Sequence, residues 1–117
     1  LGRMRTRQVY ALLEVAREDS ELEDVVATLL SACSYAGTPL ANILANRNVP
    51  LEIRKQAAFF IGRVGYLSAL PVVERLAERL ETRLNGQQAM YFAEAREEKE
   101  AELLPYLVHT LNLLKAP

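Results

Sequence analysis

The sequence predicts an all-α fold, and three observations support this prediction. Apolar residues recur with the 3.6-residue period of a helix, whereas no stretch alternates with the two-residue period of a strand. The chain has 117 residues, and half of them are apolar, which suffices for the buried core of one domain. Turn-forming residues separate the periodic stretches. We therefore expect about seven helices in a single domain spanning residues 1–117.

The first two expected helices lie before residue 37. Residues 4–17 carry an apolar stripe of Val, Leu and Ala side chains. Ser20 and Glu23 then form a capping-box pattern, in which the Ser20 hydroxyl accepts a hydrogen bond from the backbone of Glu23 and the Glu23 carboxylate reaches back. Gly37 is placed to end the second helix, because glycine readily adopts the left-handed conformation found after a helix C-terminus.

The third and fourth expected helices each begin beside a proline. Thr38 and Pro39 resemble an N-cap followed by proline at the first helical position, and a short helix over residues 40–46 follows. Pro50 starts the fourth helix, and Gly65 closes it. Six residues of the fourth helix are expected to face inward: Ile53, Ala57, Ala58, Phe60, Ile61 and Val64.

Three further helices are expected over residues 68–86, 87–100 and 103–114. Pro105 is tolerated in the last of them, because a backbone N–H in the first turn has no intrahelical partner. The sixth helix and the turn after it are dense in charge, which is typical of a solvated helix face. Their charged residues are Glu94, Arg96, Glu97, Glu98, Lys99, Glu100 and Glu102.

An internal repeat relates the second expected helix to the fourth at an offset of 28 residues. The aligned positions are apolar at 25/53, 29/57, 30/58, 33/61 and 36/64, and glycine at 37/65. A second match, at an offset of 34, aligns residues 104–107 with 70–73. Because the two offsets differ, we expect stacked helix pairs joined by loops of variable length.

Residues 50–73 carry the most specific pattern in the chain. It consists of proline, an aliphatic–Arg pair, paired alanines, aliphatic–Gly twice, and then Ala-x-Pro-x-aliphatic. The residues that form it are Pro50, Ile53, Arg54, Ala57, Ala58, Ile61, Gly62, Val64, Gly65, Ala69, Pro71 and Val73. This block resembles the HEAT-repeat family, a HEAT-like, armadillo-type α-solenoid.

The resemblance to HEAT repeats implies a fold, a structural role for one residue and a class of function. The fold would be a right-handed α-α superhelix, a short HEAT-like solenoid of about seven helices. Arg54 would bond to an acidic or carbonyl group of the adjoining repeat, as part of a structural ladder. Such families mostly act as protein-binding scaffolds through the face formed by the second helix of each pair.

Charge and composition exclude several classes of partner. The chain has 14 basic and 15 acidic residues, so its net charge of -1 argues against binding to nucleic acid or to an anionic membrane surface. No apolar run approaches the roughly 20 residues of a membrane span. The single cysteine, Cys33, fits a reducing compartment, so a cytoplasmic location is expected. The chain begins at Leu1 rather than Met, so a fragment of a longer chain is also an expectation.

Residues that could perform catalysis are sparse. His109 is the only histidine and Cys33 the only thiol, so a His-rich metal site is excluded. A nucleophile–base pair of Cys33 and His109 is less favoured than a buried cysteine and an exposed or partner-facing imidazole. We therefore expect no catalytic, metal or cofactor site and no enzyme activity.

The fifth expected helix supplies candidate partner-binding residues. Its inward stripe leaves a mixed-charge outward face of the kind that suits a protein partner. The residues of this face are Glu74, Arg75, Glu78, Arg79 and Thr82. Phe59 and Tyr66 are further candidates, as an exposed aromatic anchor of the kind enriched at interaction hot spots.

The last expected helix is apolar nearly all round, so packing on one side would leave apolar side chains exposed. We expect it to pack on a second copy, on a continuation of the chain or on a partner. The candidates for this self-association are Tyr106, Leu107, Val108, Leu111 and Leu114.

The leading functional hypothesis is a non-catalytic protein–protein interaction or scaffolding module. Such a module would bind a protein partner or form a homo-oligomer. The alternatives are a HEAT-like enzyme or enzyme subunit, similar to a phycobilin lyase or a DNA glycosylase, and an oligomerisation or regulatory segment of a larger protein. The glycosylase alternative needs a basic concave groove, against which the net charge argues.

Overall fold

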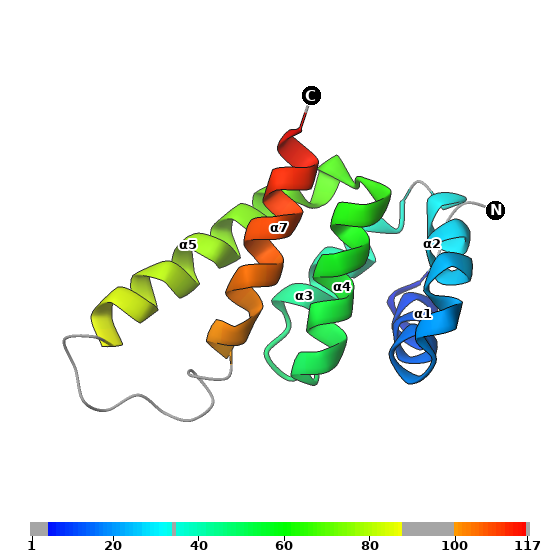
Figure 1. Ribbon diagram of the computed structural model, residues 1–117, viewed down its shortest axis with the longest axis horizontal. Coiled ribbons are helices and arrows are strands. Elements are labelled where there is room, and N and C mark those ends of the chain that lie inside the picture. Colours follow the sequence, from blue (N-terminus) through cyan, green and yellow to red (C-terminus); the bar gives the residue numbers. More distant parts are fainter. Residues whose placement is uncertain (1–4, 34, 88–99, 117) are drawn as a thin grey trace.

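The computed structural model describes residues 5–33, 35–87 and 100–116. Within these ranges the chain forms helices and no strand, which confirms the predicted all-α class. The α-helices of the described ranges are α1 (Thr6–Glu18), α2 (Glu23–Ser31), α3 (Gly37–Ala45), α4 (Leu51–Val64), α5 (Leu70–Gln87) and α7 (Leu104–Lys115) (Figure 1). Most of the expected sixth helix, at residues 88–99, lies outside the described ranges.

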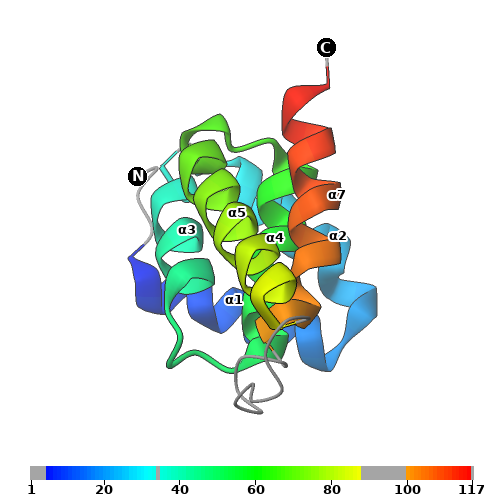
Figure 2. The same ribbon diagram turned by 90° about the vertical axis from the view of Figure 1, so that its left-hand side faces the viewer.

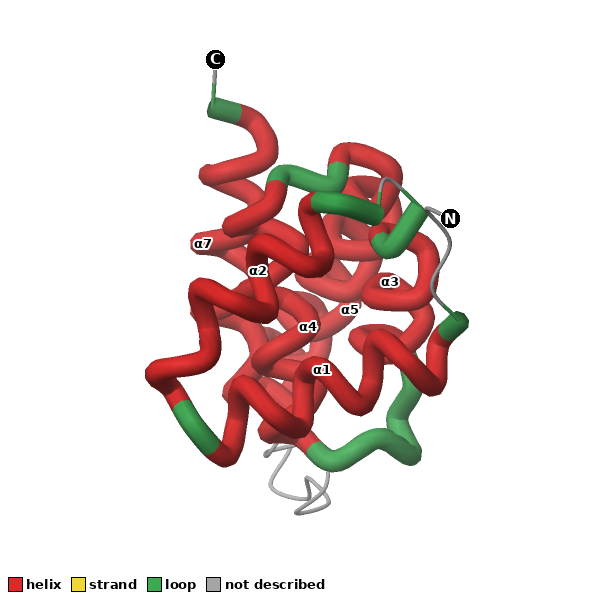
Figure 3. The backbone as a smooth tube through the Cα atoms, turned by 90° about the vertical axis from the view of Figure 1, so that its right-hand side faces the viewer, coloured by secondary structure: helices red, strands yellow, loops and turns green. Residues whose placement is uncertain are grey.

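The helices form two layers of three. Helices α2, α4 and α7 lie in one layer, and α1, α3 and α5 lie in the other (Figures 1 and 2). Three pairs pack across the layers, namely α1 with α2, α3 with α4, and α5 with α7. The pairs follow one another along the longest dimension of the molecule, which measures 49 × 32 × 23 Å. Figure 3 looks onto one end of this stack, with α1 and α2 nearest the viewer.

Helix α4 occupies the centre of the molecule and contacts α1, α2, α3 and α7. Its expected inward residues are buried except Val64, which is half-buried, and Phe60 is among the largest fully buried side chains. Proline at position 50 caps the helix N-terminus, and Gly65 ends it in the left-handed conformation with a φ of 87°. The Gly65 N–H donates to the Ile61 carbonyl at 3.0 Å, as a left-handed cap requires. The predicted ends of the fourth helix are therefore confirmed.

The prediction for Gly37 is wrong. Gly37 lies in the first turn of α3, after the N-cap residue Ala36, and Gly65 is the one described glycine with a positive φ. A Cβ atom at position 37 would lie 2.5 Å from Ser68 Oγ and 3.0 Å from Tyr66 Cβ. The glycine is therefore needed for the close approach of two segments. Because α3 begins at Gly37, Thr38 and Pro39 lie inside the helix and do not act as the expected N-cap and first helical residue.

The start of α2 also differs from the prediction. Residues Ser20–Leu22 form a 3₁₀ turn, and the Asp19 carboxylate, rather than the Ser20 hydroxyl, accepts from the Glu21 N–H at 3.0 Å. An Asp before a turn competes well for a nearby backbone donor, because its side chain is short and charged. Helix α2 therefore begins only at Glu23.

The second sequence match relates residues 70–73 to residues 104–107. Both segments begin a helix, but the two helices lie in different layers (Figure 2). Helices α5 and α7 each follow a 3₁₀ turn, Leu67–Ala69 and Ala101–Leu103, and each begins with the dipeptide Leu-Pro. However, α7 lies in the layer of α2 and α4, whereas α5 lies in the other layer (Figure 2). The shared motif therefore specifies how a helix begins and not where it packs.

Candidate functional site

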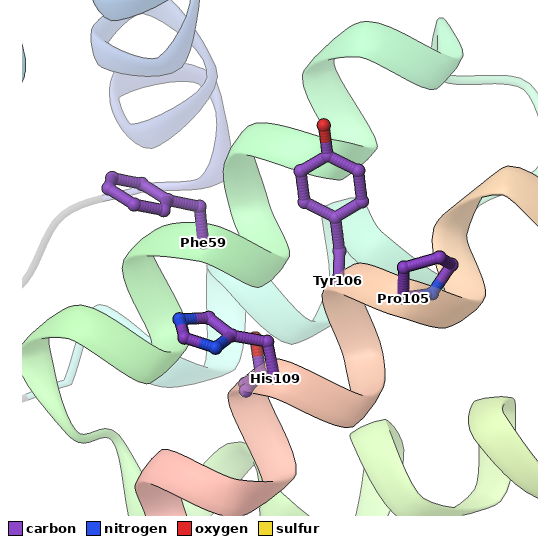
Figure 4. A pocket seen from close by; sticks show the side chains of 5 residues that line it. Phe59, Pro105, Tyr106 and His109 are labelled. Atoms are coloured by element: carbon purple, nitrogen blue, oxygen red, sulfur yellow. The ribbon is translucent and has the colours of Figure 1, made fainter.

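An apolar groove lies between α4 and α7 on the described surface. It has a volume of about 240 Å³, and Phe59, Pro105, Tyr106, His109 and Thr110 line it. Figure 4 shows Phe59 on α4 and Pro105, Tyr106 and His109 on the neighbouring α7. We call this set of residues the α4–α7 groove. A second hollow of about 600 Å³ adjoins it along α7 and shares Pro105 and His109.

The packing of α7 on α4 places the groove residues at the surface. Thr110 is buried and donates its hydroxyl to the Ala58 carbonyl at 2.7 Å. Gly62 allows this close packing, because a Cβ there would lie 3.2 Å from Thr110 Cα and 3.1 Å from Leu113 Cδ1. Tyr106, one turn before Thr110, and His109, its neighbour in sequence, are both exposed and line the groove.

A charged edge borders the groove at Tyr106. The Lys55 ammonium lies 5.6 Å from the centroid of the Tyr106 ring, in cation–π range. Lys55 Nζ also lies 3.4 Å from a Glu52 oxygen and 3.3 Å from a Glu102 oxygen. Burial acts to lower the pKa of Lys55, but the hydrogen bonds and charges of Glu102 and Glu52 raise it above its ordinary value. The groove thus combines aromatic area with an ion-paired edge formed by Lys55, Glu52 and Glu102.

The residues expected for self-association do not share one face of α7. Tyr106 and Val108 are exposed, and Leu111 is half-buried. Leu107 and Leu114 are buried within the domain, so the prediction that they are available to a second copy is wrong. Because α7 packs on both α4 and α5, this chain itself covers most of the apolar circumference of the helix.

The outward residues expected on α5 divide between solvent and intramolecular contacts. Arg75 and Glu78 are exposed, and the Thr82 hydroxyl donates to the Glu78 carbonyl at 2.9 Å. Glu74 is half-buried and lies 3.8 Å from Lys115 Nζ, whereas Arg79 points toward Glu100. All five residues thus have exposed side-chain atoms, and two of them, Glu74 and Arg79, also form intramolecular ion pairs.

The two aromatic candidates have different environments. Phe59 is half-buried, makes an edge-to-face contact with Phe60, and lines the groove. Tyr66 is buried, and its hydroxyl donates to the carbonyls of Leu30 and, at 2.9 Å, Cys33. Burial, with a smaller effect from Cys33, raises the pKa of Tyr66 to about 12. The expectation of an exposed pair of aromatics is therefore wrong for Tyr66.

A second site gathers four arginines around the buried carboxylate of Glu100, and we call it the arginine cluster. Arg54 Nη1 lies 3.3 Å from Oε2, and Arg47 Nε lies 3.7 Å from the same oxygen. Arg79 Nη2 and Arg83 Nη1 lie 3.1 Å and 3.3 Å from Oε1. Glu100 was expected on a solvated face, but these four partners compensate its burial.

Arg54 joins the arginine cluster to α3, the helix that precedes its own. Its Nε donates to the Leu44 carbonyl at 2.8 Å, so it bonds to both a carbonyl and an acidic group, as the HEAT resemblance implies. Burial lowers the pKa of Arg54, while the charge of Glu100 and its hydrogen bond act in the opposite direction. The guanidinium stays charged because its ordinary pKa is very high.

Sequence reasoning did not find the arginine cluster or the groove as sites. Arg47 follows α3, Arg79 and Arg83 lie on α5, and Glu100 precedes α7, so only the tertiary fold brings them together. The four-residue spacing of Arg79 and Arg83, which places both on one helix face, was the available signal. For the groove, the signal was Thr110, a polar residue in an apolar helix.

Cys33 and His109 occupy unlike environments. Cys33 is half-buried beside the Tyr66 hydroxyl, and His109 is exposed on the groove. Within the described ranges, no three His, Cys, Asp or Glu side chains are grouped so that they could hold a metal ion. None of the described helices is both long enough and apolar enough to cross a membrane.

In comparisons with known proteins, no family model, curated protein or solved structure matches this chain.

Proposed function

We propose that this chain is a non-catalytic protein-binding module built as a short HEAT-like α-solenoid. Three features support the solenoid: the stacking of helix pairs in two layers, the left-handed turn at Gly65, and the bonds of Arg54 to α3 and to Glu100. Solenoids of this kind present extended surfaces to other proteins.

The α4–α7 groove is the observation that carries the proposal. Aromatic residues beside a shallow apolar hollow are the usual anchors of a protein interface. Phe59 and Tyr106 supply such area from two adjacent helices, and Lys55 adds a charge that selects for partner orientation. His109 supplies hydrogen-bonding atoms at the centre of the groove.

A comparative pull-down tests this function. The wild-type domain, a Phe59→Ser/Tyr106→Ser variant and a Leu67→Ser control are immobilised and exposed to host lysate. Leu67 is an exposed apolar residue outside the groove, so it controls for a general loss of apolar surface. We expect one defined protein to bind wild type and the control but not the groove variant. Capture of nucleic acid or pigment alone, or equal binding by all three, would contradict the proposal.

Self-association through α7 is a second candidate, favoured by the exposure of Tyr106, Val108 and Leu113 on one helix. Light scattering over a range of concentrations distinguishes it from partner binding, because Val108→Asp would then reduce the mass to that of one chain. We also propose a cytoplasmic location, which rests on the single free thiol of Cys33.

A further inference from the structure

The arginine cluster has more positive charge than its acidic residue can neutralise. Within the described residues, the three guanidinium groups of Arg54, Arg79 and Arg83 share the one carboxylate of Glu100, so three positive charges face one negative charge and the excess is +2. Two other described acidic residues, Glu102 and Glu74, are paired with Lys55 and with Lys115. These two acidic side chains therefore pair with lysines outside the arginine cluster.

Both oxygens of Glu100 already accept hydrogen bonds, one on Oε2 from Arg54 and two on Oε1 from Arg79 and Arg83. A carboxylate offers about four lone-pair positions, two on each oxygen. Oε1 faces Arg79 and Arg83, and Oε2 faces Arg54 and Arg47. Arg54 is 3% exposed, and its Nη2 is buried without a hydrogen-bond partner in the described structure. Within the described residues, the cluster therefore has an unused N–H donor as well as excess positive charge.

Solvent reaches the cluster from the side of α5. The side chains of Arg79 and Arg83 are 41% and 23% exposed. Each donates one hydrogen bond to Glu100 and has further N–H groups that can donate. They are one helical turn apart, which is a suitable spacing for holding one tetrahedral anion between them. Glu100 and Arg54 are buried, and the bonds that Glu100 accepts from Arg79 and Arg83 hold these two arginines in place.

We propose that the arginine cluster is a binding site for a doubly charged oxyanion of the phosphate type, held by the outward N–H groups of Arg79 and Arg83. A dianion suits the site because the excess charge is greater than one, and planar guanidinium groups match the oxygen spacing of phosphate. This site is separate from the α4–α7 groove and does not depend on the proposed function.

Thermal unfolding with inorganic phosphate tests the site in the whole 117-residue chain. Wild type, Arg79→Gln/Arg83→Gln and an Arg75→Gln control are compared in millimolar phosphate and in acetate at one ionic strength. Arg75 lies on the same helix but outside the cluster. At ten times the Kd, phosphate should raise the Tm of wild type and control by roughly 5 °C. The double variant should lose this increase.

General salt effects act equally on all three proteins, so the difference between them reports the site. Equal increases in wild type, control and double variant would overturn the proposal, and so would equal increases with acetate and phosphate. Parallel titrations with inorganic phosphate and O-phosphoserine distinguish a free ion from a phosphoryl group carried on a protein. A larger increase with phosphoserine indicates the carried group, and equal increases indicate the free ion.

A Glu100→Gln variant keeps the test decisive if the double variant does not fold. Removing the carboxylate leaves four arginines without their shared anion, so this variant should have a lower Tm than wild type in acetate. Phosphate should then raise its Tm more than it raises that of wild type. An increase no larger than that of wild type would overturn the proposal.

Discussion

The segment around α2 and the segment around α4 share one sequence pattern but differ in burial. At the offset of 28 residues, Val25 and Leu29 align with Ile53 and Ala57. In the structure, Val25 and Leu29 are 53% and 45% exposed, whereas Ile53 and Ala57 are 1% and 0% exposed. The same apolar period therefore forms a helix in both segments, but two aligned positions that are buried on α4 are exposed on α2.

The number of neighbouring helices explains the difference. Helix α4 lies in the middle of its layer and contacts helices on several sides, whereas α2 lies at the end of its layer and packs on α1 and α4 (Figure 3). In stacked repeats each unit buries its apolar face on the next, so a terminal unit keeps one face uncovered. Position in the stack, rather than the local pattern, determines which apolar residues are buried.

The largest expected effect comes from Arg54, which aligns with the apolar Val26 of the other segment. Arg54→Met removes the donor to the Leu44 carbonyl and one partner of buried Glu100, so unfolding should require about 3–5 kcal/mol less free energy. Arg63→Met, on the same helix, breaks a pair with exposed Asp24 and should change stability by less than about 1 kcal/mol. Urea unfolding measures both. Similar values for the two variants would show that burial of the pair is not what matters.

A matched pair of truncations tests the contrast in burial itself. Ile53→Ala should destabilise the domain by about 2–5 kcal/mol, because it leaves a cavity in the core. Val25→Ala should change stability by less than about 0.5 kcal/mol, because Val25 is half-exposed. Chemical denaturation monitored by circular dichroism gives both values. A loss above 1 kcal/mol for Val25→Ala would mean that another surface covers α2 in solution.

The sequence predicted a helix well where the residues that determine its ends and its buried face lie close together in the chain. The left-handed Gly65, the cap at Pro50 and the inward residues of α4 follow from residues within one turn of each other. Gly37 was misassigned because a glycine can serve either a positive φ or a close contact, and the contact with Ser68 and Tyr66 comes from a distant segment. A single sequence does not distinguish these two uses of glycine.

The candidate sites were less predictable because they are tertiary. Glu100 belongs to a run of charged residues that is typical of a solvated face, yet arginines from three other parts of the chain surround it. Tyr66 was expected at the surface because it follows a turn, yet two backbone carbonyls of the α2 segment accept from its hydroxyl. The bonds of Arg54 were anticipated only through the family resemblance, which encodes long-range contacts that spacing does not.

Replacing either of the two aligned glycines by alanine should destabilise the domain, but for a different reason at each position. Gly37→Ala places a methyl group against Ser68 and Tyr66, which should destabilise the domain by about 1–3 kcal/mol. Gly65→Ala meets no neighbour but must adopt a φ of 87°, which should cost about 1 kcal/mol. A Ser68→Ala background relieves one contact, so it should reduce the effect of Gly37→Ala and leave that of Gly65→Ala unchanged. A double-mutant cycle of unfolding free energies makes this comparison, and equal coupling at both glycines would contradict it.

Tyr66, which ties the α4–α5 turn to the α2 segment, should make the stability of the domain depend on alkaline pH. Its pKa is about 12 in the folded chain and about 10 in an unfolded one, so the unfolded state loses this proton first as the pH rises. The contribution of Tyr66 to stability is therefore complete below pH 10 and is lost as the pH rises toward 12. Tyr66→Phe should lower stability by about 1 kcal/mol at neutral pH through the lost hydrogen bonds, and its stability should then fall less between pH 10 and 12. Tyr106→Phe, at an exposed groove residue, should retain the wild-type decline. Urea unfolding at pH 9 to 12 measures this dependence. If the free energy of unfolding fell equally for wild type and Tyr66→Phe, the alkaline loss of stability would come from other groups, and Tyr66 would not be the link between the two segments.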